Sequence, residues 1–417
     1  MILLLIIADD FTGALDTGVQ FAARGARTEV VVDPQIAFSA CGADVLVVDT
    51  ETRHLLAADA YKAVFDLVER ARRAGVRFIY KKTDSALRGN IGAELTALLR
   101  ASGEKRLPFL PAYPQVGRTT VGGVHLVNGV PVAESVFGQD PFEPVRHSAV
   151  AELIAEQSGV PVHLSPALGA GDPVPGGEGI LVFDGQTPED LSSTARRLLE
   201  DGGLHIMAGC AGFGAVLPAL LGLASDSPKE APQLSERLLV VCGSVNPISV
   251  AQMAAAEAAG VARWQMTPEQ KLQPDYWRTE KGQAEFAAIR EGVARNNPYI
   301  IDTNDKERNR LTDEYAASHG IDIDGIRLGV SQSIGYLVGN LFTDPSVGTL
   351  LITGGDTLLQ CMEQMGVREV EPVRELTTGV VLSRVSYQGC THCVLTKSGG
   401  FGKETLVTDL ARQLARC

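Results

Sequence analysis

Three short segments in the first part of the chain carry charged side chains of both signs. They are ADDFTG (8–13), DTETRH (49–54) and KKTDS (81–85). Together they offer Asp9, Asp10, Asp49, Arg53, Lys81, Lys82, Asp84 and Ser85. Arginine binds carboxylates and phosphates through a planar fork, and lysine binds them as a point charge. Aspartates accept hydrogen bonds from hydroxyl groups, and one of them can take a hydroxyl proton as a general base. The combination indicates a site for a small hydroxylated anion.

Three segments in the second part of the chain are instead rich in glycine and hydroxyl groups. They are GSVNP (243–247), TGGDT (353–357) and KSGGFG (397–402). Glycine lets backbone N–H groups approach a phosphate closely, and a following helix adds a favourable dipole. SGGFGKET resembles a P-loop, but Glu404 replaces its Ser or Thr and Lys397 replaces its first glycine. GCAGFG (209–214) does not have the glycine spacing of a dinucleotide fingerprint.

Each charged segment follows an apolar run, and this pattern places the segments in a fold. Apolar runs without alternation, separated by helical stretches, predict parallel strands covered on both faces. The strands predicted in the first part are 3–8, 28–32, 44–49, 76–80, 107–110, 179–184 and 204–209. Because ligands bind beyond the carboxyl ends of such strands, we expect the three charged segments to share one edge of a sheet.

The pattern changes twice along the chain. Residues 115–150 alternate around an Asn128-Gly129 turn, which predicts an inserted hairpin. Residues 222–236 contain prolines and small or charged residues and are the best linker. A second strand–helix series follows, with apolar runs at 238–243, 299–305, 349–357 and 392–402 and a long helix near 326–341. We therefore predict two Rossmann-like α/β domains with parallel-rich sheets, at residues 1–228 and 237–417.

The bulk composition excludes several classes of protein. The chain has 417 residues and a formal charge of −13, which argues against nucleic-acid binding through phosphate attraction. The N-terminal run MILLLIIADD lacks a basic region and ends in two aspartates, so it predicts a strand rather than a signal peptide. No run reaches transmembrane length, so we expect a cytoplasmic protein that binds no membrane. Association into a homo-oligomer is compatible with the sequence.

Each feature also has a plainer structural interpretation. Asp10 or Thr12 suits a helix N-cap, and Arg53 suits a solvated surface. The KKTDS segment suits a charged loop that caps the helix expected near Asn90. His54 and His125 are interpreted as structural or surface residues. The stretch CTHC, with Cys390, His392 and Cys393, has no second pair at zinc-site spacing and receives no role, and metal ligands stay unassigned.

Taken together, the segments resemble the four-carbon acid sugar kinase family. The matching segments are IADDFTGALDTGVQFAARGARTEV, ADVLVVDTETR, YKKTDSALRGNIGAEL, GRTTVGGVHLVNGVPVAES, VCGSVN, LITGGDT and TKSGGFG. They run in this order over nearly the whole chain, and the first two are most similar to D-threonate kinases. The resemblance implies an N-terminal sugar-acid domain, a C-terminal ATP domain and a cleft between them.

The resemblance also implies an activity and a set of residues. The expected reaction is ATP-dependent phosphorylation of the terminal hydroxyl of D-threonate, with Mg²⁺; D-erythronate and 3-oxo-tetronate are alternative substrates. The substrate positions implied are Asp10, Arg53, Lys82, Thr83, Asp84 and Ser85. The nucleotide positions implied are Ser244, Gly354, Gly355, Asp356, Thr357, Gly399, Gly400, Phe401 and Gly402. Either Asp10 or Asp84 is expected to meet the reacting hydroxyl.

Two other functions fit the same loops. A sugar-acid binding or sensing protein needs the charged loops but no catalysis. A hydroxy-acid dehydrogenase would explain the α/β pattern and the GCAGFG stretch.

Overall fold

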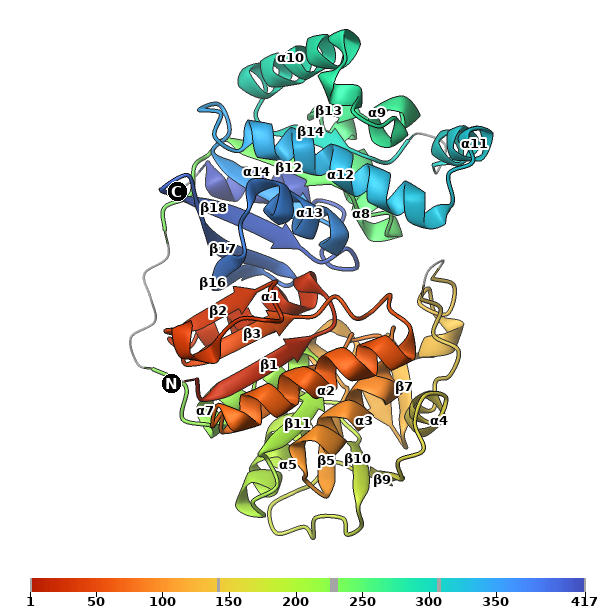
Figure 1. Ribbon diagram of the computed structural model, residues 1–417, viewed down its shortest axis with the longest axis vertical. Coiled ribbons are helices and arrows are strands. Elements are labelled where there is room, and N and C mark those ends of the chain that lie inside the picture. The colour runs from red at the N-terminus through yellow and green to blue at the C-terminus, as the bar shows by residue number, and fades with distance from the viewer. Residues whose placement is uncertain (1, 141–142, 226–231, 306–308, 416–417) are drawn as a thin grey trace. The chain divides into compact units, whose positions relative to one another are not determined.

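The computed structural model describes residues 2–140, 143–225, 232–305 and 309–415. The chain divides into two compact units, Met1–Lys229 and Glu230–Cys417, each with its own sheet and core (Figure 1). Of the predicted linker at 222–236, residues 226–231 lie outside the described residues. The prediction of two α/β domains with parallel-rich sheets is confirmed.

The first unit is built on a parallel sheet in the order β2-β3-β1-β4-β11-β5-β10-β9. Its strands are β1 (Leu4–Ala8), β2 (Thr28–Val31), β3 (Val45–Asp49), β4 (Phe78–Lys82), β5 (Arg106–Leu110), β9 (Val162–Ser165), β10 (Gly179–Phe183) and β11 (Ile206–Gly209). Most of them are continuous buried apolar runs, as expected for strands covered on both faces. The sequence patterns predict all of these strands except β9, which is partly exposed.

Helices cover both faces of this sheet (Figure 1). They are α1 (Phe11–Ala22), α2 (Ala57–Arg73), α3 (Ile91–Ser102), α4 (Val150–Ala155), α5 (Pro188–Glu200), α6 (Ala211–Gly214) and α7 (Leu217–Leu220), with the short helices η1 (Phe38–Ala40), η2 (Pro114–Val116) and η3 (Val132–Glu134). The α2 and α3 helices pack against each other and share one core with alternate strand residues such as Leu5 and Ile7. The α1 helix packs with α6 and α7.

The predicted insertion is present as a small antiparallel sheet. Its strands are β6 (Arg118–Val121), β7 (Val124–Val127) and β8 (Val130–Pro131). Asn128 and Gly129 join β7 to β8 with φ angles of 50° and 82°. Two positive φ angles fit a two-residue hairpin turn, whose twist matches that of the strands it joins.

The second unit is built on a mixed sheet in the order β13-β14-β12-β15-β18-β17-β16. Its strands are β12 (Leu238–Cys242), β13 (Ala262–Gln265), β14 (Tyr299–Asp302), β15 (Thr349–Thr353), β16 (Glu369–Thr377), β17 (Val380–Tyr387) and β18 (Cys390–Lys397). The five strands from β13 to β18 in the sheet order pair in parallel, whereas β17 pairs antiparallel with both β18 and β16. The sequence patterns do not predict β13, β16 or β17.

The helices of the second unit also lie on both faces of its sheet (Figure 1). They are α8 (Pro247–Ala258), α9 (Pro268–Leu272), α10 (Glu280–Arg295), α11 (Arg310–His319), α12 (Ile323–Leu341), α13 (Gly355–Met365) and α14 (Leu406–Leu414), with the short helix η4 (Tyr276–Arg278). The α8 and α14 helices share one apolar cluster with β12, β15 and β18, and α12 packs against α13. No helix in the described ranges is both long enough and apolar enough to cross a membrane.

Candidate active site

The three charged segments of the first unit meet at one edge of its sheet, as the sequence predicts. β1 lies between β3 and β4, and the register pairs Ala8 with Asp49 on one side and with Lys82 on the other. The loops after these strands therefore leave the sheet side by side. This edge brings Asp10, Arg53 and Asp84 within one cluster of ion pairs.

Arg53 is the centre of that cluster. Its Nε donates to Asp9 Oδ2 at 2.8 Å, and its Nη1 donates to Asp10 Oδ2 at 2.9 Å. Its Nη2 lies 2.7 Å from Asp10 Oδ1 and 3.7 Å from Asp84 Oδ1. Burial alone would lower the pKa of Arg53, but the charges of Asp10, Asp9 and Asp84 outweigh it and raise the pKa well above its ordinary value. Arg53 is therefore a buried permanent cation and not a surface residue.

Asp9 and Asp10 share this guanidinium but differ in exposure. The side chain of Asp9 is 1% exposed and that of Asp10 is 18% exposed. Asp10 Oδ1 also accepts a hydrogen bond from the backbone N–H of Gly13 at 3.0 Å, which caps the N-terminus of α1. Asp10 is thus both a helix cap and a member of the charged cluster, and it is the more accessible carboxylate of the two.

Asp84 is held by the turn that follows β4. Its Oδ2 accepts from the backbone N–H of Ala86 at 3.1 Å, and Arg88 forks the carboxylate with Nε and Nη2 at 3.0 Å each. Burial raises the pKa of Asp84, but the charges of Arg88 and Arg53 outweigh it and hold the pKa well below its ordinary value. Sequence reasoning missed Arg88 as the partner of Asp84, because this ion pair forms across a turn and not along a helix.

The two lysines of KKTDS belong to β4 and not to the loop after it. Because side chains alternate along a strand, they lie on opposite faces of the sheet. Lys81 is fully buried, and its Nζ lies 3.1 Å from Glu94 Oε2 on α3. Lys82 lies near Gly13 of α1, where an added Cβ would be 2.5 Å from Lys82 Nζ and 2.5 Å from Asp10 Oδ1. None of the ion pairs found in the described ranges includes Lys82, but its positive charge helps to lower the pKa of Asp9 and of Asp84.

Thr83 and Ser85 complete the predicted substrate positions. The backbone N–H of Thr83 donates to Gly209 at 2.8 Å, and its buried hydroxyl has no hydrogen-bond partner among the described residues. The carbonyl oxygen of Ser85 lies 2.9 Å from Nε2 of His125. Burial lowers the pKa of His125 to about 4, so this imidazole is neutral at pH 7. His54, by contrast, pairs with Glu143 at the surface.

The three glycine-rich segments of the second unit also meet at one sheet edge. β15 lies between β12 and β18, and its last residue Thr353 is in register with Cys242 and Lys397. These loops approach one another closely at glycines, where there is no room for a side chain. A Cβ added to Gly243 would lie 1.7 Å from Thr357 Oγ1, and one added to Gly399 would lie 2.6 Å from Ser244 Oγ. The φ of Gly354 is 108°, a conformation that other residues rarely adopt.

Buried polar side chains support the third glycine-rich loop, residues 397–402, through hydrogen bonds to its backbone. The carbonyl oxygen of Gly399 accepts from Ser249 Oγ and from Lys397 Nζ, each at 3.0 Å. Gln252 Nε2 donates to the carbonyl oxygen of Phe401 at 3.0 Å. Sequence reasoning missed Ser249 and Gln252, which lie on α8 about 150 positions before the loop that they support.

The remaining nucleotide positions lie around these contacts. Gly355 opens α13, and Asp356 follows it in the first turn. The side chain of Asp356 is outside the part of the chain that the structure describes. Gly400 is half-buried, and Gly402 has a φ of 86°. The arrangement forms a backbone-lined surface of closely packed glycines, which suits a phosphate group.

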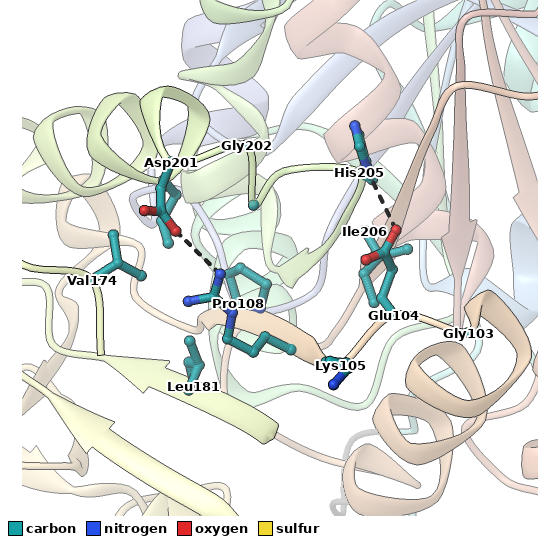
Figure 2. A pocket seen from close by; sticks show the side chains of 13 residues that line it. Gly103, Glu104, Lys105, Pro108, Val174, Leu181, Asp201, Gly202, His205 and Ile206 are labelled. Atoms are coloured by element: carbon teal, nitrogen blue, oxygen red, sulfur yellow. Dashed lines mark hydrogen bonds and ion pairs between the residues drawn. The ribbon is translucent and has the colours of Figure 1, made fainter. Parts of the chain in front are cut away.

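A hollow of about 380 Å³ in the first unit lies away from these residues. It is lined at the amino ends of β5 and β11, where Arg106 lies 3.2 Å from Asp201 and His205 lies 3.5 Å from Glu104 (Figure 2). None of the predicted site residues lines it. Ligands of parallel sheets bind at the carboxyl ends of the strands, so this hollow is not the candidate site.

The described residues contain no cluster of side chains that resembles a metal site. No group of three or more His, Cys, Asp or Glu side chains there has a geometry that would hold a metal ion. Cys390 and Cys393 lie in β18 as free thiols, the first exposed and the second partly buried.

Comparisons with known proteins identify a different domain in each part of the chain. The model of a sugar-binding N-terminal domain matches residues 4–217, and that of a nucleotide-binding C-terminal domain matches residues 239–407. A D-threonate kinase of Salmonella typhimurium is 32% identical over 97% of both chains. A D-erythronate kinase of Heliobacterium modesticaldum is 32% identical over 61% of this chain and 60% of its own. A solved structure from Salmonella typhimurium LT2, 20% identical, superposes with a TM-score of 0.75 over 98% of this chain and 99% of its own, which shows a shared fold. The chain belongs to the four-carbon acid sugar kinase family.

Proposed function

We propose that this chain transfers the γ-phosphoryl group of ATP to the C4 hydroxyl of a four-carbon sugar acid, and that the acid is D-threonate. The observation that carries the proposal is the Arg53 cluster at the carboxyl edge of the first sheet, in a unit that matches a sugar-binding domain. The substrate is chosen because a named D-threonate kinase is 32% identical over nearly its full length.

The sugar acid is proposed to bind over Asp10, Arg53 and the stretch Lys82 to Ser85. Lys82 supplies the positive charge for the substrate carboxylate, since most of the N–H donors of Arg53 are taken by aspartates. Arg53 contributes to substrate binding by holding those aspartates in place and by offsetting their negative charge. The buried hydroxyl of Thr83 and the half-buried Ser85 are then the partners for substrate hydroxyls. A carboxylate and several hydroxyls are the groups that such a set recognises.

Asp10 is proposed as the residue that meets the reacting hydroxyl. A general base must accept a proton, and Arg88 and Arg53 hold the pKa of Asp84 well below its ordinary value, which makes Asp84 a weak proton acceptor. The side chain of Asp10 is more exposed than that of Asp84. Among the described residues, Asp10 is paired with one arginine, Arg53, whereas Asp84 is paired with two. Asp84 is then a binder that orders the turn on which Ser85 lies.

The nucleotide is proposed to bind over the glycine segments of the second unit. Backbone N–H groups at Ser244, at Gly354 to Thr357 and at Gly399, Gly400 and Gly402 would hold the phosphates, whereas the N–H of Phe401 already donates to the carbonyl oxygen of Ser398. Mg²⁺ is proposed to bind with ATP, where it neutralises charge on the phosphates. Phosphoryl transfer needs mainly positioning and charge neutralisation, and these residues offer both.

A screen for ADP release tests the proposal. The acceptors are D- and L-threonate, D- and L-erythronate and 3-oxo-tetronate, each with ATP and Mg²⁺. We expect the largest kcat/KM with D-threonate. A larger kcat/KM with D-erythronate or 3-oxo-tetronate would show that this acid, and not D-threonate, is the preferred substrate. Binding of an acid without ADP release would indicate a binding protein, and binding of NAD(H) would indicate a dehydrogenase.

A further inference from the structure

The inserted segment, residues 118–140, packs directly against the turn that holds Asp84 and Ser85. It contains β6, β7, β8 and η3 and ends at Asp140. Its buried residues Val127, Val132 and Phe137 belong to the same apolar cluster as Ala86 and Leu87 of the turn. An insertion that only decorated the surface would not share a core with a site loop.

The first polar contact from this segment reaches Asp84 through Arg88. Arg88 forks Asp84, and its Nη1 lies 3.2 Å from Asp140 Oδ2 of the inserted segment. The Arg88 guanidinium also lies over the ring of Phe137, 5.3 Å from its centroid. Arg88 is therefore held on three sides, and its position fixes the carboxylate of Asp84. The exposed fractions of the Asp84 and Asp140 side chains are only 10% and 17%, so water screens these pairs weakly.

The backbone between Asp84 and Arg88 is strained. Leu87 is 2% exposed and has a φ of 63°, which costs a branched residue about 1–2 kcal/mol. This turn directs the side chain of Arg88 back to Asp84, four residues earlier. Such strain persists only where the surroundings hold it, and it is concentrated at functional sites. Here the surroundings include Val132 and Phe137 of the inserted segment.

The second polar contact reaches Ser85 through His125 of β7. His125 is fully buried; its Nε2 lies 2.9 Å from the carbonyl oxygen of Ser85, and its Nδ1 lies 3.0 Å from Thr120 Oγ1. Because a carbonyl only accepts, Nε2 carries the proton and Nδ1 accepts from the Thr120 hydroxyl. The ring thus links β6 and β7 to the backbone of Ser85.

We propose that the inserted segment is the positioning element of the sugar-acid site, acting on Asp84 through Arg88 and on Ser85 through His125. The inference rests on the proposed function, because it takes Asp84 and Ser85 as substrate contacts. Arg88 and His125 are positioning residues, since each acts through another side chain or backbone group. Two acids that differ in one hydroxyl orientation are distinguished only if their partners are fixed to within a fraction of an ångström, so this segment determines selectivity.

The variants Arg88→Lys and Asp140→Asn test the first contact. Lysine keeps the charge but cannot fork a carboxylate, and asparagine keeps the shape of Asp140 but weakens its pair with Arg88. We expect kcat/KM for the sugar acid to fall about 10²-fold in Arg88→Lys and less in Asp140→Asn. KM for ATP should stay constant, and the ratio of kcat/KM for D-threonate over D-erythronate should shrink. The control is Arg106→Lys, which alters a more exposed Arg–Asp pair at the amino end of β5 in the same sheet.

A matched pair at His125 tests the second contact. His125→Gln can place an amide N–H near the position of Nε2, whereas His125→Leu fills the space but donates nothing. We expect the leucine variant to lose selectivity and the glutamine variant to recover a large part of it. Calorimetric binding of each acid without nucleotide is measured alongside the kinetics, with thermal unfolding to compare the folded state.

The outcomes separate the two proposals. Loss of selectivity in Arg88→Lys with a normal melting transition supports the positioning role. Wild-type kcat/KM and wild-type selectivity in both Arg88→Lys and His125→Leu would overturn it, as would losses no larger than that of Arg106→Lys. If the wild type binds the acids but transfers no phosphate, the proposed kinase activity fails, and the selectivity of binding still decides the positioning role. If the wild type binds none of these acids, both fail.

Discussion

Arg53 holds both carboxylate oxygens of Asp10, with Nη1 2.9 Å from Oδ2 and Nη2 2.7 Å from Oδ1. The two residues come from the loops after β3 and β1, and the same guanidinium also contacts Asp9 and Asp84. One buried cation therefore orders three carboxylates from two loops, Asp9 and Asp10 after β1 and Asp84 after β4. Asp10 is the only one of the three that also caps a helix, and its side chain is the most exposed. This fixed but reachable carboxylate is the basis of the proposed proton acceptor.

Replacing Asp10 by asparagine tests that role. Asparagine caps helices as well as aspartate does, so α1 should stay intact, but an amide cannot take a proton. We expect kcat to fall about 10²-fold or more in steady-state assays. The control is Asp322→Asn, the corresponding change at the N-cap of α12. An unchanged kcat with a raised KM would make Asp10 a binding residue only.

Replacing Lys82 by methionine tests the anchor of the substrate carboxylate. Methionine keeps the buried apolar stem of lysine and removes the charge, which lies near Gly13 of α1 and the carboxylate of Asp10. A lost charge-assisted hydrogen bond is worth about 1.5–3 kcal/mol, so sugar-acid affinity should fall about 10- to 100-fold. Calorimetry with the acid alone measures this, and ATP affinity should not change. Equal losses for both ligands would point to misfolding, which Lys105→Met, at the exposed surface, would not share.

A methyl group at Gly399 should disrupt the nucleotide site. The Cβ of Gly399→Ala would lie 2.6 Å from Ser244 Oγ and 3.2 Å from Asn246 Cβ, so the Ser244 side chain must rotate or one of the two loops must move. We expect ATP affinity to fall at least about 10-fold while sugar-acid binding persists, measured by calorimetry for each ligand. Gly339→Ala in α12 is the control, because its nearest neighbour would be a methionine Cγ at 3.8 Å. Wild-type ATP affinity in Gly399→Ala would place the phosphates elsewhere.

Asp49 gives a prediction for the pH dependence of stability. Burial and the neighbouring charge of Glu51 raise the pKa of Asp49 well above its ordinary value. The unfolded chain then releases this proton at lower pH than the folded chain, so stability is lost as pH rises through the folded-state pKa. Asp49→Asn removes that loss. We expect its free energy of unfolding to exceed that of the wild type at pH 7 and to exceed it by much less at pH 4, measured by urea unfolding. A gain that is equal at both pH values would contradict the raised pKa.

Continuous apolar runs predicted most of the fold and the ends of the strands at which the charged loops and the glycine-rich loops meet. Where a run such as 44–49 or 238–243 is buried on both faces, its end also marks a ligand-facing loop, and the predicted edges are the edges found. The partly exposed strands β9 and β13 and the antiparallel pair β16–β17 have no such run and were not predicted.

Individual side-chain partners were beyond sequence reasoning. Lys81 looks like a loop residue until Glu94, on the following helix, is seen to neutralise it inside the core. Likewise, the position of Arg88 depends on Asp140 and Phe137, about 50 positions later in the chain. Long-range partners of this kind are set by packing between elements, which local patterns do not record.

The position of the phosphate on the product tests the central claim most directly. Wild-type protein is incubated with ATP, Mg²⁺ and D-threonate, and the product is examined by phosphorus and carbon NMR. The account predicts one ADP for each phosphomonoester, with the phosphorus coupled to C4. Release of inorganic phosphate without a sugar-acid ester, or an ester at C2 or C3, would contradict it.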